Sequence, residues 1–432
     1  MSLRQAARAV FDAALQAADV RPLVHRALAE VRPPARGRVV VVGAGKASGA
    51  MAAAVENALG DRIAEGLVVV KDGYRAETHR VSLVEAGHPV PDARGEAAAR
   101  RIRALAEAAG ADDLLLVLVS GGGSALTPAP VPPITLEDKQ AMTRLLLAAG
   151  ANINQLNTVR KHCSLLKGGQ LARAAAPARV HALLLSDVIG DPLDVIASGP
   201  TAPDASTFAE ALAILERFDL RSRTPRSIVD RLERGRRGEI PETPKPDDPV
   251  FRAVTNTVIG NNLLVVEAAA ARARTLGYTP HLLTRALEGE AREVAGTLVE
   301  LARQIRDGRG PVAPPACVIA GGETTVTVRG RGAGGRCQEF TLAAALALEG
   351  MDGVVALAAG TDGTDGPTEA AGAVADGATA GRAREHGHDP RSRLADNDSN
   401  PVFAALGDLL VTGPTNTNLL DLYLLLVDPP SR

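Results

Sequence analysis

The sequence predicts a two-domain α/β protein whose sheets are mainly parallel. Its 432 residues exceed the roughly 250–300 residues that one hydrophobic core normally serves, so two domains are expected. Apolar runs of strand length alternate with longer amphipathic segments along the chain, which is typical of strands joined by crossover helices. The runs are apolar at nearly every position, as in parallel strands that are buried on both faces of a sheet.

The expected elements follow from these runs and from the segments between them. Strands are predicted in the first half over 38–45, 66–73, 81–87, 113–122 and 181–188. Strands are predicted in the second half over 253–260, 279–286, 316–328, 353–363 and 420–427. Helices are predicted over 93–109, 135–149, 161–175, 261–276, 289–306 and 337–349.

A change in composition marks the expected boundary between the domains. Residues 221–250 are rich in proline and in charged side chains, which predicts a short helix followed by a linker. We therefore expect one α/β domain over residues 1–243 and a second over residues 250–432. The glycine-rich segment at 329–336 is expected to be a mobile loop.

Composition and charge exclude several classes of protein. The formal net charge of −2 lacks the basic excess of a general nucleic-acid binder, and the 2% of aromatic residues includes no tryptophan for base stacking. No apolar run approaches the roughly 20 residues of a membrane-spanning helix. The three cysteines lie far apart, as in proteins of a reducing compartment. We expect a cytoplasmic protein without nucleic-acid or membrane partners, and a homo-oligomer remains open.

The segment GAGKASG, residues 43–49, follows one predicted strand and opens an alanine-rich helix. Glycines let the backbone approach a ligand, and the start of a helix offers N–H groups to an anion. Lys46 inside this turn would add a positive charge for a carboxylate or a phosphate. The third glycine comes one residue later than in the dinucleotide-binding pattern. The alternative is a tight turn with an exposed lysine.

A second glycine-rich loop follows the predicted strand that begins at residue 113. It consists of Ser120, Gly121, Gly122, Gly123 and Ser124. Three consecutive glycines predict a nest of N–H donors for an anion, most plausibly phosphate, because a plain turn needs a single glycine. The loop is not a Walker A sequence, which also requires a following lysine.

Charged side chains follow three other strands or loops. Asp187 and Asp362 come at strand ends, where a carboxylate can hold Mg²⁺ together with phosphate oxygens. Either carboxylate could instead accept a proton from a hydroxyl, cap a helix or shape a turn. Arg336 follows two glycines at a predicted helix start, where a guanidinium can clamp a carboxylate or a phosphate.

In this order, the motifs resemble those of the class II glycerate kinases, whose C-terminal half is called the MOFRL domain. The resemblance spans nearly the whole chain. It is carried by VVGAGKAS (41–48), GHPVPD (87–92), LVSGGGSAL (118–126), NTVRKHCSLLKGGQLA (157–172), SDVIGDPLDVIASGPT (186–201), GGETTVTVRG (321–330), GGRCQEF (334–340), AGTDGTDGPTEAAGAVAD (359–376) and TGPTNTNLLDL (412–422).

The resemblance implies a Rossmann-like, nucleotide-binding first domain, a MOFRL-like second domain and an active site in the cleft between them. It also implies ATP- and Mg²⁺-dependent phosphoryl transfer to D-glycerate, which gives 2-phosphoglycerate. Lys46 and Arg336 fall on the basic pair of the family and are assigned to catalysis and substrate binding. We assign the 120–124 loop to the ATP phosphates, Mg²⁺ to Asp187 or Asp362, and removal of the hydroxyl proton to Asp187.

Two alternatives remain open at this point. Some relatives carry the older label hydroxypyruvate reductase, which would make the protein an NAD(P)-dependent enzyme. Lys71, followed by Asp72, stands where a dinucleotide-binding strand would end in an acidic residue, and this disfavours the reductase. A non-catalytic sensor of sugar acids would need no metal-binding carboxylates.

The sequence departs from the family at Cys337, where the family has asparagine, but Arg336 is retained.

Overall fold

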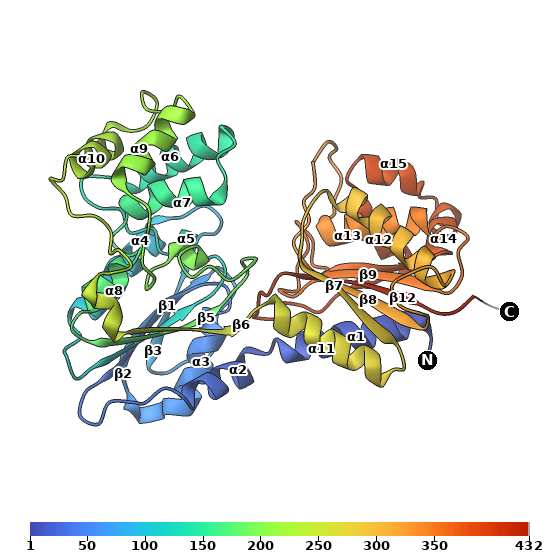
Figure 1. Ribbon diagram of the computed structural model, residues 1–432, viewed down its shortest axis with the longest axis horizontal. Coiled ribbons are helices and arrows are strands. Elements are labelled where there is room, and N and C mark those ends of the chain that lie inside the picture. The colour runs from blue at the N-terminus through green and yellow to red at the C-terminus, as the bar shows by residue number, and fades with distance from the viewer. Residues whose placement is uncertain (431–432) are drawn as a thin grey trace. The chain divides into compact units, whose positions relative to one another are not determined.

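The computed structural model describes residues 1–430, which form two compact units (Figure 1). The first unit comprises residues 20–259. The second unit joins residues 1–19 to the part of the chain that begins at Gly260. Each unit contains a six-stranded sheet, so the predicted α/β architecture with two domains is confirmed.

The sheet of the first unit has the strand order β3-β2-β1-β4-β5-β6, and the pairs among β1–β5 are parallel. The strands are β1 (Val39–Ala44), β2 (Ile63–Lys71), β3 (Val81–Ala86), β4 (Leu114–Val119), β5 (Arg179–Leu185) and β6 (Val254–Gly260). Strands β1 and β4 are buried at every position, as their continuous apolar runs predict. Because the strands are parallel, the loops that follow β1, β3, β4 and β5 emerge at one edge of the sheet.

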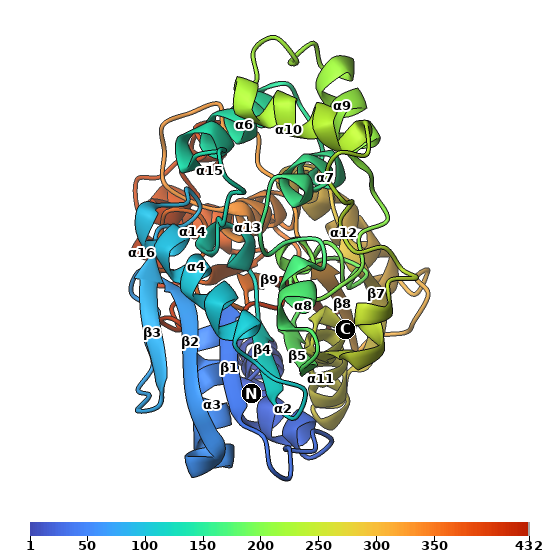
Figure 2. The same ribbon diagram turned by 90° about the vertical axis from the view of Figure 1, so that its left-hand side faces the viewer.

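The helices of the first unit form two groups. They are α2 (Val20–Leu28), α3 (Ser48–Leu59), α4 (Ala93–Glu107), α5 (Gly123–Leu126), α6 (Leu136–Ala148), α7 (Ile153–His162), α8 (Gln170–Ala175), α9 (Phe208–Arg217) and α10 (Arg226–Arg236), with the 3₁₀ helices η1 (Gly60–Arg62), η2 (Ile196–Ser198) and η3 (Pro249–Ala253). Helices α6, α7, α9 and α10 share a hydrophobic core that is separate from the core of the sheet. These four helices lie apart from the sheet in both views (Figures 1 and 2).

The helix predicted over 161–175 is wrong as a single element. Helix α7 ends at His162 and α8 begins at Gln170. Between them, Gly168 and Gly169 have φ angles of 58° and 78°, which are left-handed conformations that interrupt a right-handed helix. A Cβ on Gly169 would lie 2.9 Å from the ring of Phe251, so this turn also needs a glycine for space.

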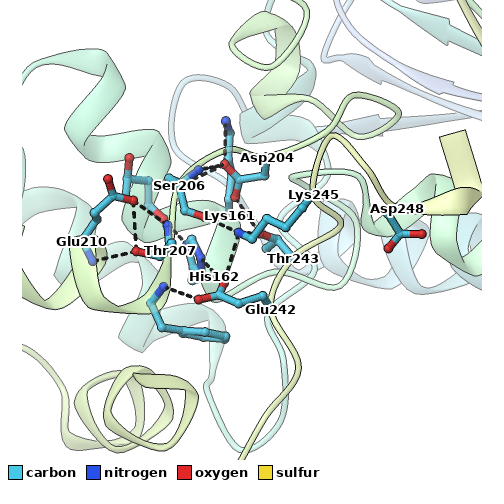
Figure 3. A network of polar contacts seen from close by, with 12 residues as sticks. Lys161, His162, Asp204, Ser206, Thr207, Glu210, Glu242, Thr243, Lys245 and Asp248 are labelled. Carbon is cyan, nitrogen blue, oxygen red and sulfur yellow. Dashed lines mark hydrogen bonds and ion pairs between the residues drawn. The ribbon is translucent and has the colours of Figure 1, made fainter. Parts of the chain in front are cut away.

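The segment predicted as a linker is held firmly within the first unit (Figure 3). The Glu242 carboxylate lies 3.1 Å from His162 Nε2 on α7, and the Thr243 hydroxyl donates to Asp204 at 3.0 Å. The Lys245 ammonium donates to the Thr243 hydroxyl at 3.0 Å and pairs with Glu242 at 3.3 Å. These contacts explain why the chain does not leave the unit at this point.

The compact units consequently differ from the predicted ranges 1–243 and 250–432. The first unit extends to residue 259 because β6 adds to the edge of its sheet beside β5. The second unit takes up residues 1–19 because helix α1 (Leu3–Ala17) packs on α11 (Asn262–Thr275). Both differences come from contacts between segments that are distant in the sequence.

The sheet of the second unit is mixed, with the strand order β11-β10-β9-β12-β8-β7. Its strands are β7 (Thr279–Leu287), β8 (Ala316–Gly322), β9 (Val354–Gly360), β10 (Gly372–Asp376), β11 (Leu409–Leu410) and β12 (Asp421–Val427). Strand β12 runs antiparallel to both β8 and β9, β10 runs antiparallel to β9 and β11, and β7 and β8 are parallel. The prediction of a mainly parallel sheet is therefore wrong for this unit.

Helices cover both faces of this second sheet. Besides α1 and α11, they are α12 (Ala291–Arg306), α13 (Arg336–Ala347), α14 (Thr379–Glu385), α15 (Pro390–Ala395) and α16 (Ser399–Leu406). Helices α1 and α11 lie on one face, and α12 and α13 lie on the other (Figure 1). Across residues 1–430, no helix is both long enough and apolar enough to cross a membrane.

The glycine-rich segment predicted to be mobile is bound to a neighbouring turn. The amides of Arg329 and Gly330 donate to the side chain of Asn397 at 2.8 and 3.0 Å, and the amide of Ala333 donates to Asp398 at 2.9 Å. A Cβ on Gly332 would lie 2.3 Å from the Cβ of Asp398. The glycines therefore permit a close approach between two loops.

Arg4 joins the first helix to the rest of the second unit. Its guanidinium donates to Asp376 at 2.5 Å, to Asp408 at 2.7 Å and to the Thr379 hydroxyl at 2.8 Å. The Asp408 side chain is 7% exposed, and burial of such a charge is tolerated only when it is paired.

We expect Arg4→Ala to lower the stability of the second unit by about 2 kcal/mol, because it removes a shared partner of two carboxylates. Differential scanning calorimetry measures the change. Arg8→Ala is the matched control, because the pair of Arg8 with Asp12 is exposed on the same helix and is expected to contribute less than about 0.5 kcal/mol. Equal losses in the two variants would contradict the anchoring role of Arg4.

Candidate active site

The turn that carries Lys46 is locked to the loop after β4. Gly45 has a φ angle of 148°, and a Cβ on it would lie 2.0 Å from the hydroxyl oxygen of Ser120. The amide of Lys46 donates to the carbonyl of Gly121 at 2.9 Å. The two glycine-rich motifs at 43–49 and 120–124 therefore form one continuous structure at the edge of the sheet.

The side chain of Ser120 has a structural role. It is fully buried, accepts a hydrogen bond from the Ala47 amide at 3.0 Å and lies 3.0 Å from the Ser48 hydroxyl. The prediction named Ser120 as a phosphate ligand, but its hydroxyl is already engaged at the start of helix α3. Ser120 positions the turn that carries Lys46.

The backbone of the 120–124 loop retains open donors. The structure, over residues 1–430, records no hydrogen bond from the amides of Gly121, Gly122 and Ser124. The amide of Gly123 is used within the loop, where it donates to the Ser120 carbonyl at 3.2 Å. A loop with several unused N–H groups is a suitable cradle for an anion, because each unpaired amide can donate one hydrogen bond.

His88 lies beside this loop. A Cβ on Gly122 would lie 3.1 Å from its Nε2 atom. Burial, followed by the charges of Lys46 and Lys71, lowers the pKa of His88 to about 4. The imidazole is therefore neutral near pH 7. Its sequence signal was the polar segment GHPVPD directly after a strand.

Arg336 begins helix α13 in the second unit and is held by two carboxylates. Its Nε and one terminal nitrogen donate to Asp421 at 2.5 and 2.9 Å, and the other terminal nitrogen lies 2.7 Å from Glu323. Burial alone would lower the pKa of Arg336, but the hydrogen bonds and charge of Asp421 raise it above its usual range. The Asp421 side chain is 1% exposed and also accepts from the Tyr423 hydroxyl at 3.0 Å. Sequence reasoning missed Asp421.

The loop after β9 places its two carboxylates differently. Asp365 is buried and accepts from the amides of Cys337 and Gln338 at 3.1 and 2.8 Å, so it caps helix α13. Burial raises the pKa of Asp365 to about 6 despite these hydrogen bonds. Asp362 Oδ1 accepts from the Thr364 amide at 3.0 Å. A Cβ on Gly360 would lie within 3.4 Å of both Asp362 and Asp421, so Asp362 and the Arg336–Asp421 pair are neighbours.

Asp187 follows β5 in the first unit and is partly buried. The hydroxyl of Ser186 beside it accepts from the amide of Val188 at 3.3 Å, which shapes the turn. In the described part of the chain, no group of three or more His, Cys, Asp or Glu side chains is arranged to hold a metal ion. An all-protein metal cage is therefore absent from residues 1–430.

The structure brings the predicted residues together in two sets. In the first unit, Lys46, the 120–124 loop and His88 share one edge of the sheet. In the second unit, Arg336 and Asp362 lie near one another around Asp421. The predicted location of the active site in the cleft between the domains stays a prediction. This fold and these anion-binding features define an α/β enzyme of small, negatively charged substrates.

Comparisons with known proteins give the family. The DUF4147 domain family, described as a domain of unknown function, matches residues 6–233, and the MOFRL family matches residues 316–421. A D-glycerate 2-kinase from Thermotoga maritima is 42% identical over 404 residues, covering 93% of this chain and 94% of the relative. The chain therefore belongs to the DUF4147/MOFRL glycerate 2-kinase family.

Two further similarities concern the fold and the older label. The crystal structure of a glycerate kinase from T. maritima superimposes with a TM-score of 0.90 at 40% identity, covering 98% of this chain and 99% of that chain. A protein of Agrobacterium vitis, named provisionally as a hydroxypyruvate reductase, is 46% identical over 429 residues, covering 99% of this chain and 95% of the relative. The resemblance deduced from the motifs is thereby confirmed.

We expect Asp421→Asn to lower the stability of the second unit by about 3 kcal/mol, because it removes the buried carboxylate of the bidentate pair and leaves Arg336 only the more exposed Glu323. Calorimetric unfolding measures this loss. The control is Glu323→Gln, which removes the more exposed partner of the same guanidinium and should change stability by less than about 1 kcal/mol. If Asp421→Asn unfolds like the wild type, the ion pair does not organise this site.

Proposed function

We propose that this protein is an ATP- and Mg²⁺-dependent glycerate 2-kinase. It transfers the terminal phosphoryl group of ATP to the 2-hydroxyl of D-glycerate and forms 2-phosphoglycerate. The observation that carries this assignment is the joining of Lys46 to the open amides of the 120–124 loop, in a chain 42% identical to a D-glycerate 2-kinase. Lys46 supplies a cation, and the 120–124 loop supplies N–H donors, where phosphate would lie.

The amides of Gly121, Gly122 and Ser124 are the proposed donors to the ATP phosphates. Transfer of a phosphoryl group requires little covalent work from the protein and depends on positioning and on neutralisation of charge. Backbone donors suit this task because the fold already holds them in place, so they need no reorganisation when charge develops. Ser120 is a positioning residue, since its hydroxyl fixes the turn at Ala47.

Lys46 and Arg336 have different proposed parts. Lys46 is a point charge on a flexible chain, suited to follow the transferring phosphoryl group. The bidentate bond of Arg336 to Asp421 fixes the plane of its guanidinium. We therefore assign Arg336 to orienting the carboxylate of D-glycerate and Lys46 to stabilising the charge of the transferred group.

Mg²⁺ fits the donor set that the chain offers. It takes one or two carboxylates and completes its shell with waters and substrate phosphates, so it does not need a cage of three protein carboxylates. Asp187 or Asp362 would hold it, and the ion would neutralise phosphate charge. Asp187 is the proposed acceptor of the proton from the 2-hydroxyl, the part that a carboxylate plays in many kinases.

The reductase reading fits the geometry less well. Asp72, the acidic residue after β2, accepts hydrogen bonds from Arg94 at both carboxylate oxygens, each at 2.8 Å. A dinucleotide-binding fold needs the corresponding carboxylate for the ribose hydroxyls. Gly49, the displaced third glycine, faces the Tyr74 carbonyl and the side chain of Val70 on β2, which a Cβ would approach to 3.0 and 3.1 Å. The glycine thus serves helix–strand packing.

The direct test follows the products of ATP, Mg²⁺ and D-glycerate by ³¹P NMR. We expect a new phosphomonoester at the 2-position, formed in the presence of Mg²⁺ and lost when the ion is chelated. Unchanged ATP in the presence of folded protein, together with oxidation of NAD(P)H by hydroxypyruvate, would support the reductase instead.

We expect Lys46→Ala to lower kcat/KM by about 10²–10³-fold, the effect of removing one electrostatic donor to a transition state. Steady-state kinetics with saturating Mg²⁺ measures the change. Lys71→Ala provides the control, because Lys71 ends the neighbouring strand β2 and contributes a similar charge to the surroundings of His88. Near-normal activity of Lys46→Ala would refute the proposed mechanism.

A further inference from the structure

A cavity of about 300 Å³ lies within the first unit beside the 120–124 loop. Helices α6 and α7, the segment around Pro89–Pro91 and the short helix α5 enclose it. Ser124 belongs both to the lining of this cavity and to the predicted phosphate loop. The cavity thus reaches the predicted phosphate loop at Ser124, and none of the other predicted site residues lines it.

The interior of the cavity is strongly cationic. Lys139, Arg160 and Lys167 line it, together with Arg144 nearer the surface. Lys139 is 4% exposed, and its ammonium has no hydrogen-bond partner among residues 1–430. Lys167 is 2% exposed and donates to the Ser124 carbonyl at 2.7 Å. Among the described residues that line the cavity there is no carboxylate.

The positive charges of this cluster have no carboxylate beside them among the described residues that line the cavity. Burial lowers the pKa of Lys139 to about 8 and that of Arg160 to about 10, and burial with the charges of Lys139 and Arg160 lowers the pKa of Lys167. The charge of Glu96 opposes the shift at Lys139, but Glu96 does not line the cavity. Buried amines without a direct ionic partner are costly, and proteins normally pair them. A bound anion would supply the missing partner and favour the charged forms of both lysines.

The mouth of the cavity is apolar. Pro89, Val90, Pro91, Leu147 and Leu156 contribute to its walls. Val90 and Leu147 are large apolar side chains that are nevertheless 63% and 57% exposed. A site with an apolar mouth and a cationic interior matches a ligand that has a flat apolar part and a polyanionic part.

We propose that this cavity is the nucleotide pocket of the enzyme. The base lies against the walls around Val90 and Leu147, and the phosphates extend past Lys139, Arg160 and Lys167 to the amides of the 120–124 loop. This inference rests on the proposed function, which requires ATP. D-Glycerate fits the cavity less well, because it is small for a volume of about 300 Å³ and has no apolar part to match the walls around Val90 and Leu147.

The test uses the full-length protein and adenylyl imidodiphosphate, a non-hydrolysable ATP analogue, with Mg²⁺ in isothermal titration calorimetry. Leu147→Glu places a negative charge at an exposed wall position, where misfolding is not expected. Lys139→Met removes the unpartnered buried cation and keeps an apolar stem. Ile153→Glu is the matched control, because Ile153 is an apolar residue of α7 that is 54% exposed and does not line the cavity.

We expect Leu147→Glu and Lys139→Met each to weaken binding of the analogue about tenfold or more, through repulsion or loss of an ionic partner. In kinetics, KM for ATP should rise in both variants while KM for D-glycerate stays unchanged. Ile153→Glu should behave like the wild type in both measurements.

Wild-type affinity for the analogue in Leu147→Glu and Lys139→Met would overturn the assignment. A rise in KM for D-glycerate with an unchanged KM for ATP would also overturn it, because the cavity would then hold the acid. Absence of analogue binding by the wild type would overturn it as well. If the analogue binds as expected but no phosphorylated glycerate forms, the nucleotide pocket stands and the proposed function fails.

Discussion

The buried hydroxyl of Ser120 joins the two glycine-rich turns on which the first unit's site depends. It accepts a hydrogen bond from the start of helix α3, and Gly45 approaches it so closely that no side chain could stand there. The neighbouring backbone bond from Lys46 to Gly121 completes the connection. Because these contacts are buried at the ends of two central strands, the position of Lys46 relative to the open amides follows from the packing of the sheet.

The two units hold their cations in opposite ways. In the second unit, Arg336 is paired with two carboxylates, Asp421 and Glu323, which fix its orientation and leave no excess positive charge. In the first unit, Lys139 lies in a cavity whose described lining contains no carboxylate. A paired guanidinium is suited to orient a ligand, whereas unbalanced buried cations are suited to bind a polyanion. Phosphoryl transfer between a small acid and a nucleotide calls for both.

The apolar pattern predicted where strands lie but not the direction in which they run. All ten predicted strands are present, including β12, whose seven residues are all buried. A continuous apolar run reports burial on both faces, and β12 is buried on both faces although it runs antiparallel to its neighbours. Strands β10 and β11 were not predicted, because β10 consists mainly of small residues and β11 has only two residues.

The motifs predicted where the site residues lie better than they predicted the role of each side chain. Glycine-rich loops after strands indicated backbone donors, and the open amides of Gly121 and Gly122 agree with that expectation. The inward turn of the Ser120 hydroxyl depends on contacts with residues more than seventy positions away, which a local motif does not encode. Lys139 received no role for a similar reason, because the local pattern of an amphipathic helix does not show which cavity its lysine lines.

The central claim is that the loop at 120–124 receives the nucleotide phosphates through its backbone. Hydrogen exchange of the amides of Gly121, Gly122 and Ser124, followed with and without saturating adenylyl imidodiphosphate and Mg²⁺, tests it most directly. We expect rapid exchange in the free protein and marked slowing when the analogue is bound. Unchanged exchange at these three amides in the fully bound protein would contradict it.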